Sequence, residues 1–382
     1  MKKKDFVVTV QKEDLIKALK LVYKSVPNNP QLPVLSSILL SIKEGRLSLS
    51  STDLYFGTQS KITISSAAQH TIAVPGILFK EVISSLDDEL IKLEIKNQGL
   101  VIRSNGGVIK IPTQNPADFP EFPKIKSKKL TLTQSIIEEI NKFVCIAAGV
   151  DQARPILTTL LLKIVGGKLI AVSTDGFRLS VLEVEGTLEN GVLDQEILIP
   201  AKYFSEICQI ATTYQAREIE FYIEESLKQL MVKIGENKVY IRQIEGEYPP
   251  YEKIIPDEGG FTYTISIDRE QLRKEVLRAS IFSKHESGVV GFELGGELKE
   301  NEMVIQSISS LKGSYRGVVA IKKEGAGEMK TAFNSDYIKD FLNISEVDTI
   351  EIQVTEELKP AVFRVVGKKN FKYVVMPFRV NQ

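Results

Sequence analysis

The sequence is poor in the residues that usually mark a metal site or a disulfide framework. Its 382 residues include two cysteines, Cys145 and Cys208, both in apolar surroundings and without zinc-type spacing. Such cysteines are typical of buried thiols in an intracellular protein. The two histidines, His70 and His285, also lack a partner at metal-ligand spacing. We therefore expect neither a metal nor a cofactor.

Long apolar runs and an excess of one charge are absent as well. No stretch of roughly 18 apolar residues occurs, and Asp5 interrupts the segment where a signal peptide would be apolar. We expect a soluble, cytoplasmic protein with no membrane contact. Basic and acidic residues number 49 each, so no global field attracts nucleic acid. A local basic face is still compatible with this balance.

The common catalytic motifs are missing too. The sequence contains no GxSxG, HExxH or Walker lysine motif. Asp175 follows Ser-Thr at the end of a predicted strand, where an Asx or ST turn uses such oxygens on nearby amides. We therefore expect no catalytic residue. The alternative from another class is a hydrolase that uses Asp175 with His285, which requires these two side chains to converge.

What the sequence does contain is an internal repeat. The triplet Ser51–Asp53 recurs 122 positions later as Ser173–Asp175, and Pro33 has a counterpart at the same offset in Pro155. A catalytic aspartate seldom occurs twice at a fixed interval, whereas a duplicated structural unit produces this pattern. The repeat therefore favours a structural role for Asp175.

The repeat extends to three copies. An alternating strand that runs into an amphipathic helix is predicted three times, over Val8–Leu19, Leu130–Ile140 and Tyr263–Val276. A second strand-to-helix set covers Val74–Ile83, Ile199–Cys208 and Phe333–Leu342. A hairpin is expected to turn at Gly235–Asn237. We predict an α+β protein of three repeated domains, each with two helices packed on antiparallel sheets, over residues 1–126, 127–257 and 258–382.

Basic residues recur on the solvent side of these predicted helices. They are Lys17, Lys20, Lys24, Lys80, Lys202, Lys274, Arg278 and Lys339. Taken one helix at a time, such residues usually face only solvent. If equivalent helices line up, however, the residues form one basic surface that binds duplex DNA by counterion release, without reading bases.

Five segments in order along nearly the whole chain carry a family resemblance. They are "PVLSSILL", "STDGFRLS", "EYPPYEKIIP", "FNSDYIKDFL" and "YVVMPFRV". Together they resemble the bacterial DNA polymerase III beta subunit, the replicative sliding clamp of the DNA clamp family. The resemblance implies a head-to-tail homodimeric ring that encircles duplex DNA and acts as a processivity factor in DNA replication. It also implies a DNA polymerase III alpha subunit, a clamp loader and other proteins with clamp-binding motifs, in replication and repair, as partners.

The resemblance further implies a pocket for partner peptides between the second and third domains. Its residues are Arg154, Leu157, Thr174, Gly176, Phe177, Arg178, Leu179, Pro249, Lys253, Ile254, Asn334, Tyr337, Leu358, Pro360, Met376, Pro377, Phe378 and Arg379. Apolar anchors of short linear motifs would enter this pocket, with donors from Arg178 and Arg379 at its rim.

The resemblance also implies a subunit seam in which Ile109 meets Ile281 and Phe282. The sequence departs from the family pattern at Phe177, Phe378 and Lys253 in the pocket, and at Asn29 and Asp151 on the DNA side. A scaffold that binds peptides without encircling DNA is the remaining alternative.

Overall fold

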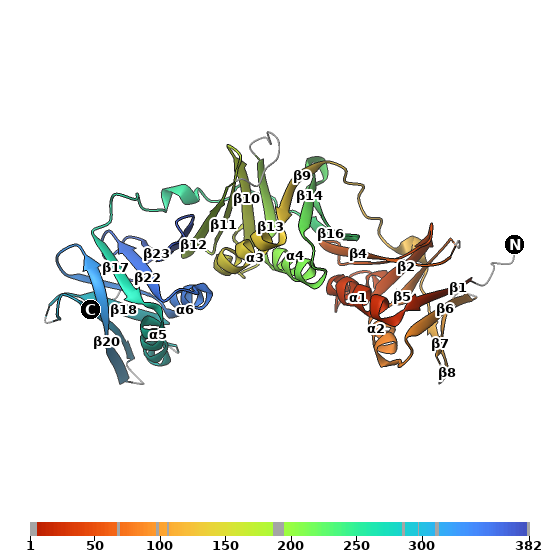
Figure 1. Cartoon of the computed structure of the whole chain (residues 1–382), viewed down its shortest axis with the longest axis horizontal. Coiled ribbons are helices and arrows are strands. Elements are labelled where there is room, and N and C mark those ends of the chain that lie inside the picture. Colours follow the sequence, from red (N-terminus) through yellow and green to blue (C-terminus); the bar gives the residue numbers. More distant parts are fainter. Residues whose placement is uncertain are drawn as a thin grey trace. The chain divides into compact units, whose positions relative to one another are not determined.

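The structure is a computed structural model. It describes residues 6–66, 69–96, 99–104, 107–185, 195–284, 287–296, 298–309 and 313–379 (Figure 1). His285, one member of the alternative catalytic pair, lies outside these ranges. The chain divides into two compact units: Met1–Gln134 with Glu206–Gln243, and Ser135–Ser205 with Ile244–Gln382.

All six predicted strand-to-helix segments are confirmed. They are β1 (Phe6–Gln11) with α1 (Lys12–Val22), β5 (His70–Pro75) with α2 (Gly76–Ser85), β9 (Lys128–Thr133) with α3 (Gln134–Phe143), β13 (Gln195–Pro200) with α4 (Ala201–Thr213), β17 (Tyr263–Asp268) with α5 (Arg269–Ser283), and β21 (Met329–Asn334) with α6 (Ser335–Ile344). In the third repeat, a polar side chain caps each helix. Asp268 accepts from the Gln271 amide at 2.7 Å, and Asn334 from the Asp336 amide at 2.8 Å. Within the described part of the chain, no helix has the length and apolar character needed to span a bilayer.

The first unit contains two antiparallel sheets. The smaller has the order β1-β6-β7-β8 and the larger β5-β2-β3-β4-β16-β15-β14-β9. The strands not yet given are β2 (Ser37–Lys43), β3 (Arg46–Thr52), β4 (Phe56–Thr63), β6 (Leu90–Lys96), β7 (Gly99–Ser104), β8 (Gly107–Pro112), β14 (Glu218–Glu224), β15 (Gln229–Ile234) and β16 (Asn237–Arg242). Helix α1 packs on β3 and β4 through buried side chains that include Leu15, Leu19 and Val22, the predicted inward face. The predicted hairpin is confirmed, since Ile234 pairs with Asn237 and Gly235 turns at a φ of 60°.

The second unit contains one continuous sheet. Its order is β13-β10-β11-β12-β24-β23-β22-β17-β20-β19-β18-β21. The strands not yet given are β10 (Thr159–Val165), β11 (Lys168–Thr174), β12 (Arg178–Val184), β18 (Val289–Leu294), β19 (Glu302–Ser309), β20 (Gly313–Glu324), β22 (Thr349–Val354), β23 (Ala361–Val365) and β24 (Phe371–Val375). The pairing of β12 with β24 joins segments almost 200 residues apart. Helix α5 packs on β19 and β20 and beside α6, which buries Phe341 against Phe363 and Tyr373.

The repeated Ser-Thr-Asp triplets form two chain reversals with the same hydrogen bonds. We call Ser51–Gly57, between β3 and β4, the first corner, and Ser173–Leu179, between β11 and β12, the second corner. In the first corner, Oδ1 of Asp53 accepts from the amides two and three residues ahead, at 2.8 and 2.6 Å. In the second corner, Oδ1 of Asp175 accepts from the equivalent amides, both at 2.9 Å. The predicted structural role of Asp175 is therefore confirmed.

The serine and threonine side chains of the two corners also make equivalent hydrogen bonds. Thr52 Oγ1 accepts from the Leu54 amide, and Thr174 Oγ1 from the Gly176 amide, both at 3.0 Å. Ser51 donates to the Val22 carbonyl, and Ser173 to the carbonyl of Val144, again 122 positions further on. These bonds satisfy backbone groups that the reversing chain removes from the sheet ladder.

The two corners share a left-handed backbone conformation at a position where the first has leucine and the second glycine. Leu54 has a φ of 79° and its equivalent Gly176 a φ of 92°, in a region that disfavours residues with a Cβ. We expect Gly176→Leu to lower the free energy of unfolding by about 1–3 kcal/mol. Leu54→Gly should leave it unchanged or raise it by up to about 1 kcal/mol, since Leu54 is 45% exposed and loses little burial. Denaturant titration of both variants tests this; equal losses would contradict it.

Candidate functional site

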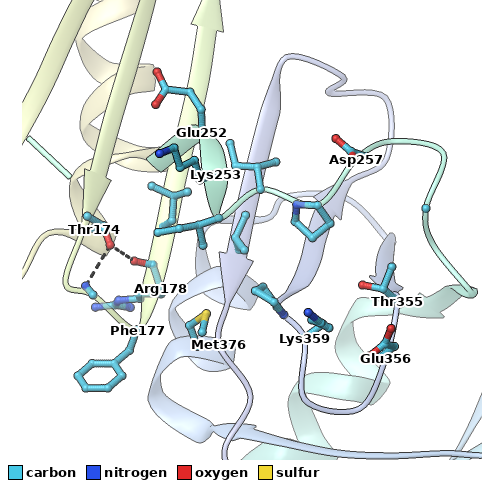
Figure 2. A pocket seen from close by; sticks show the side chains of 18 residues that line it. Thr174, Phe177, Arg178, Glu252, Lys253, Asp257, Thr355, Glu356, Lys359 and Met376 are labelled. Carbon is cyan, nitrogen blue, oxygen red and sulfur yellow. Dashed lines mark hydrogen bonds between the residues drawn. The ribbon is translucent and has the colours of Figure 1, made fainter. Parts of the chain in front are cut away.

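A cavity of about 660 Å³ opens beside the second corner (Figure 2). It is lined by Thr174, Gly176, Phe177, Arg178, Leu179, Glu252, Lys253, Ile254, Ile255, Pro256, Asp257, Gly260, Thr355, Glu356, Lys359, Pro360, Val374 and Met376. These residues come from the second corner, the segment that leads into β17, the turn between β22 and β23, and the end of β24. The volume and the mixture of aliphatic and charged side chains are typical of a site for a small ligand or a short peptide.

One wall of the cavity is built by strand pairing. Leu179 pairs with Val374, and the Met376 amide donates to the Phe177 carbonyl at 2.8 Å, so the chain end is tied to the second corner. Beneath this wall, Leu179, Val374 and Tyr251 belong to one buried apolar cluster. Because the wall continues into this core, the cavity is largely preformed.

The mouth of the cavity carries exposed apolar groups. Phe177 is 48% exposed and Met376 36% exposed, and Figure 2 shows the Phe177 ring projecting away from the other lining side chains. An exposed aromatic ring and a thioether beside a concavity favour contact with another apolar group. The exposed lysines Lys253 and Lys359 alternate with Glu252 and Glu356 around them, so the rim has mixed charge.

Arg178 anchors the second corner and has less freedom than predicted. Its Nε donates to Oδ2 of Asp175 at 3.1 Å, and its Nη1 donates to Oδ2 of Asp340 at 2.5 Å. The Arg178 side chain is 11% exposed. The expectation of a free donor at the rim is therefore wrong for Nε and Nη1, because two carboxylates already hold them.

Aromatic groups complete the surroundings of Arg178. Its Nη1 also donates to the Tyr373 hydroxyl at 3.1 Å, and its guanidinium lies 4.5 Å from the ring centre of Tyr337. Burial alone would lower the pKa of Arg178, but Tyr373, Asp340 and Asp175 raise it above its ordinary value. Burial raises the pKa of Tyr337 to about 12. The guanidinium therefore stays charged and ties β12 to α6 and β24.

The structure brings part of the predicted pocket together around the cavity. The predicted residues that line it are Thr174, Gly176, Phe177, Arg178, Leu179, Lys253, Ile254, Pro360 and Met376. Arg154 and Leu157 border it, because each has an atom 3.8 Å from the position where a Cβ on Gly176 would lie.

Other predicted pocket residues have structural roles or lie outside the lining. Asn334 caps α6, Tyr337 lies against Arg178, and the Phe378 amide donates to the Ala332 carbonyl at 2.8 Å. The Pro249 carbonyl accepts from the Tyr251 amide at 2.7 Å. The predicted residues outside the lining include Leu358, Pro377 and Arg379.

Sequence reasoning missed several residues of the lining. These are Glu252, Ile255, Pro256, Asp257, Gly260, Thr355, Glu356, Lys359 and Val374. Ile255 and Pro256 directly follow the predicted Ile254, so continuing along "EYPPYEKIIP" would have found them. Thr355 and Glu356 lie in a turn without a recognisable pattern, and only the pairing of β22 with β23 brings them to the site.

The predicted DNA-facing residues lie on helices, with one exception. Lys17 and Lys20 belong to α1, but Lys24 lies in a 3₁₀ turn, Tyr23–Ser25, because the α-helix ends at Val22. Lys80, Lys202 and Lys339 lie on α2, α4 and α6, and Lys274 and Arg278 on α5. All of the predicted DNA-facing residues except Lys24 therefore lie on α-helices, and their contact with DNA stays a prediction.

Several of these basic groups have partners within the chain. Lys24 pairs with Glu206, Arg278 with Glu275 at 2.6 Å, and Lys339 with Asp336 at 2.6 Å. Three lysines lie over tyrosine rings. The distance from Nζ to the ring centre is 4.6 Å for Lys17 over Tyr214, 3.7 Å for Lys80 over Tyr23, and 4.6 Å for Lys202 over Tyr203. Over the described ranges, Lys20 and Lys274 have no ion pair. A basic surface made from these residues would therefore carry less free charge than their number implies.

The predicted seam residues lie on β8 and on α5. Ile109 is half-buried in β8, the last strand of the smaller sheet, next to Val108, which is 53% exposed. Ile281 on α5 is 65% exposed, and Phe282 stacks on Tyr315 of β20 with ring centres 6.3 Å apart. Val108 and Ile281 are thus exposed apolar groups in the single chain, whereas Ile109 and Phe282 are partly buried.

Comparison with known proteins identifies the family. Residues 6–123 match the N-terminal domain of the DNA polymerase III beta subunit, residues 131–250 its central domain, and residues 252–379 its C-terminal domain. The chain belongs to the DNA polymerase III beta subunit family. The beta sliding clamp of Synechocystis is 27% identical over 97% of this chain and 98% of that protein.

Solved structures of this family are also similar. The DNA polymerase III beta subunit of Thermotoga maritima is 25% identical with a TM-score of 0.88, and it covers 99% of this chain and 100% of its own. A Pseudomonas aeruginosa sliding clamp bound to griselimycin is 24% identical with a TM-score of 0.90 and the same coverage. The chain therefore consists of three DNA-clamp-fold domains. It acts as a DNA sliding clamp, a processivity factor that is not an enzyme, so the hydrolase alternative is set aside.

The Arg178 contacts generate a stability prediction. In Arg178→Met, Asp175 and Asp340 lose their buried cationic partner, and we expect the free energy of unfolding to fall by about 2–3 kcal/mol. The value lies below the roughly 3–5 kcal/mol usual for a fully buried pair, because the Asp340 side chain is 43% exposed and screened by water. Urea titration measures the change. The matched control is Arg217→Met, an exposed arginine with no ion pair in the described ranges, which should stay within about 0.5 kcal/mol. Similar losses in both variants would contradict the anchoring role.

Proposed function

We propose that two copies of this chain close head to tail into a ring around duplex DNA, and that partner proteins dock short apolar segments in the cavity beside the second corner. The cavity is the observation that carries the docking proposal, since it combines a buried aliphatic wall with exposed Phe177 and Met376 at its mouth. The proposed partners are duplex DNA, bound without sequence preference, the DNA polymerase III alpha subunit, a clamp loader, and other proteins with clamp-binding motifs. We also propose a cytoplasmic location and domain boundaries after residues 126 and 257.

The chemistry of the cavity favours a peptide with aliphatic or aromatic anchors. Leu179, Ile254 and Val374 offer apolar surface, and the mixed charges of the rim impose little preference for one charge sign. Docking would then tether the polymerase and raise its effective concentration at the primer end. The griselimycin complex of the Pseudomonas aeruginosa clamp supplies a probe, and we propose that griselimycin occupies this cavity.

A substitution at the mouth tests the docking site. We expect Met376→Ala to weaken griselimycin binding by about 1–3 kcal/mol, the usual size for an apolar hot spot. Phe378→Ala should also weaken it, because the partly buried Phe378 ring lies only two residues beyond Met376 in the predicted pocket. Isothermal titration calorimetry measures both. The matched control is Val165→Ala, a similarly exposed apolar side chain on β10 outside the lining, which should bind with unchanged affinity. Wild-type affinity in both cavity variants would refute the assignment.

The ring proposal is supported by two unpaired strand edges. In the described ranges, β8 pairs only with β7, and the Gly313–Ala320 part of β20 pairs only with β19. Exposed apolar side chains accompany both edges: Val108 on β8, Val318 on β20 and Ile281 on the helix beside it. Pairing of one chain's β8 with β20 of a second chain would bury both edges. Because such a head-to-tail contact is heterologous, it must close into a ring to avoid a filament.

A substitution at the seam should prevent encirclement of DNA without unfolding the chain. We expect Ile281→Asp to shift the protein toward monomer in sedimentation across a dilution series, because it places a charge in an apolar contact. Wild-type protein loaded on nicked circular plasmid should stay bound and leave after linearisation, while the variant should not be retained. Val366→Asp, at an exposed apolar site away from the seam, is the control. Equal retention of wild type on circular and linear DNA would favour the non-encircling scaffold instead.

A further inference from the structure

The first corner has a cavity of its own, built on the same frame but much smaller. It measures about 130 Å³, against about 660 Å³ at the second corner. Its lining includes Thr52, Leu54, Tyr55 and Gly57, which lie 122 positions before Thr174, Gly176, Phe177 and Leu179. All of its residues belong to the first unit.

The strand that completes each corner is paired in the same register. Gly57 pairs with Tyr240 as Leu179 pairs with Val374. The Arg242 amide donates to the Tyr55 carbonyl at 2.9 Å, as the Met376 amide donates to the Phe177 carbonyl at 2.8 Å. Tyr240 therefore occupies the place of Val374, and Arg242 the place of Met376.

These exchanges fill the first cavity. The Tyr240 ring packs on Phe122 with ring centres 4.6 Å apart, and a Cβ on Gly57 would lie 2.5 Å from that same Phe122 ring. At the second corner, the cavity is lined by Val374, whose side chain is shorter than that of Tyr240. Leu179, the counterpart of Gly57, is buried in the apolar core behind the cavity wall. Burial raises the pKa of Tyr240 to about 12, as expected for a phenol withdrawn from water. The Tyr240 ring thus occupies space at the first corner that is open at the second.

We propose that the chain carries two versions of one docking corner and that Tyr240, packed on Phe122, closes the first. Each chain then presents a single docking site, so partner segments compete for it and cannot occupy both corners at once. The proposal rests on the proposed docking of ligands at the second corner. It assigns Tyr240 a role in limiting the number of partners, and this role is independent of the hydrogen bonds that hold the corner.

The first test is the stoichiometry of griselimycin binding, measured by isothermal titration calorimetry. Wild type should bind one molecule per chain. The double variant Tyr240→Val/Leu54→Gly removes the ring that fills the first corner and gives two of its positions the residues found at the second, and we expect two per chain. Tyr240→Phe keeps the ring and should still bind one. One molecule per chain in the double variant, or two in wild type, would overturn the proposal. No binding by wild type would instead refute the proposed docking function.

The second test closes the open corner and does not depend on the folding of the first variant. Val374→Tyr places at the second corner the residue that fills the first. We expect it to weaken griselimycin binding by at least about tenfold, since the apolar anchors lose their pocket. Val362→Ile, an enlargement in the same buried cluster away from the lining, is the control. A folded Val374→Tyr protein with wild-type affinity would overturn the proposal.

Discussion

The hydrogen bonds of the second corner are the constraint on which the docking site depends. One carboxylate oxygen of Asp175 holds the amides of Phe177 and Arg178, and the Thr174 hydroxyl holds the Gly176 amide. These local bonds define the path of the chain between β11 and β12 without using the side chains that follow. The side chains that follow are therefore available for other roles. Phe177 is exposed at the mouth, Arg178 binds two carboxylates, and Leu179 forms part of the buried wall.

Arg178 converts this local turn into a tertiary site. Its contacts with Asp340 and Tyr373 connect the corner to α6 and β24, which come from the other end of the chain. A buried guanidinium is destabilising unless its donors are matched, and here two carboxylates and two aromatic rings surround it. The cavity therefore has a rigid inner side, while its exposed apolar groups lie at the mouth. Rigidity of this kind reduces the entropy lost when a short peptide binds.

Repetition made much of the fold predictable. The six strand-to-helix segments and the two corners depend on local periodicity and on hydrogen bonds between near neighbours, and both leave a pattern in the sequence. The pocket residues were predicted by family resemblance, and half of them, among them Lys253 and Ile254, line the cavity. Thr355 and Lys359 were missed because their turn carries no periodic signal. Lys24 was placed on the wrong kind of helix because α1 ends before it.

By itself, the sequence determined the three repeats, the alternation of strands with amphipathic helices, and the equivalence of the two Ser-Thr-Asp corners. Only the tertiary structure decided that one corner is open and the other closed. The reason is that the cavity walls are completed by strands distant in the sequence, β24 in one case and β16 in the other. Whether valine or tyrosine stands beside a corner depends on strand register, and register is set by long-range pairing and burial.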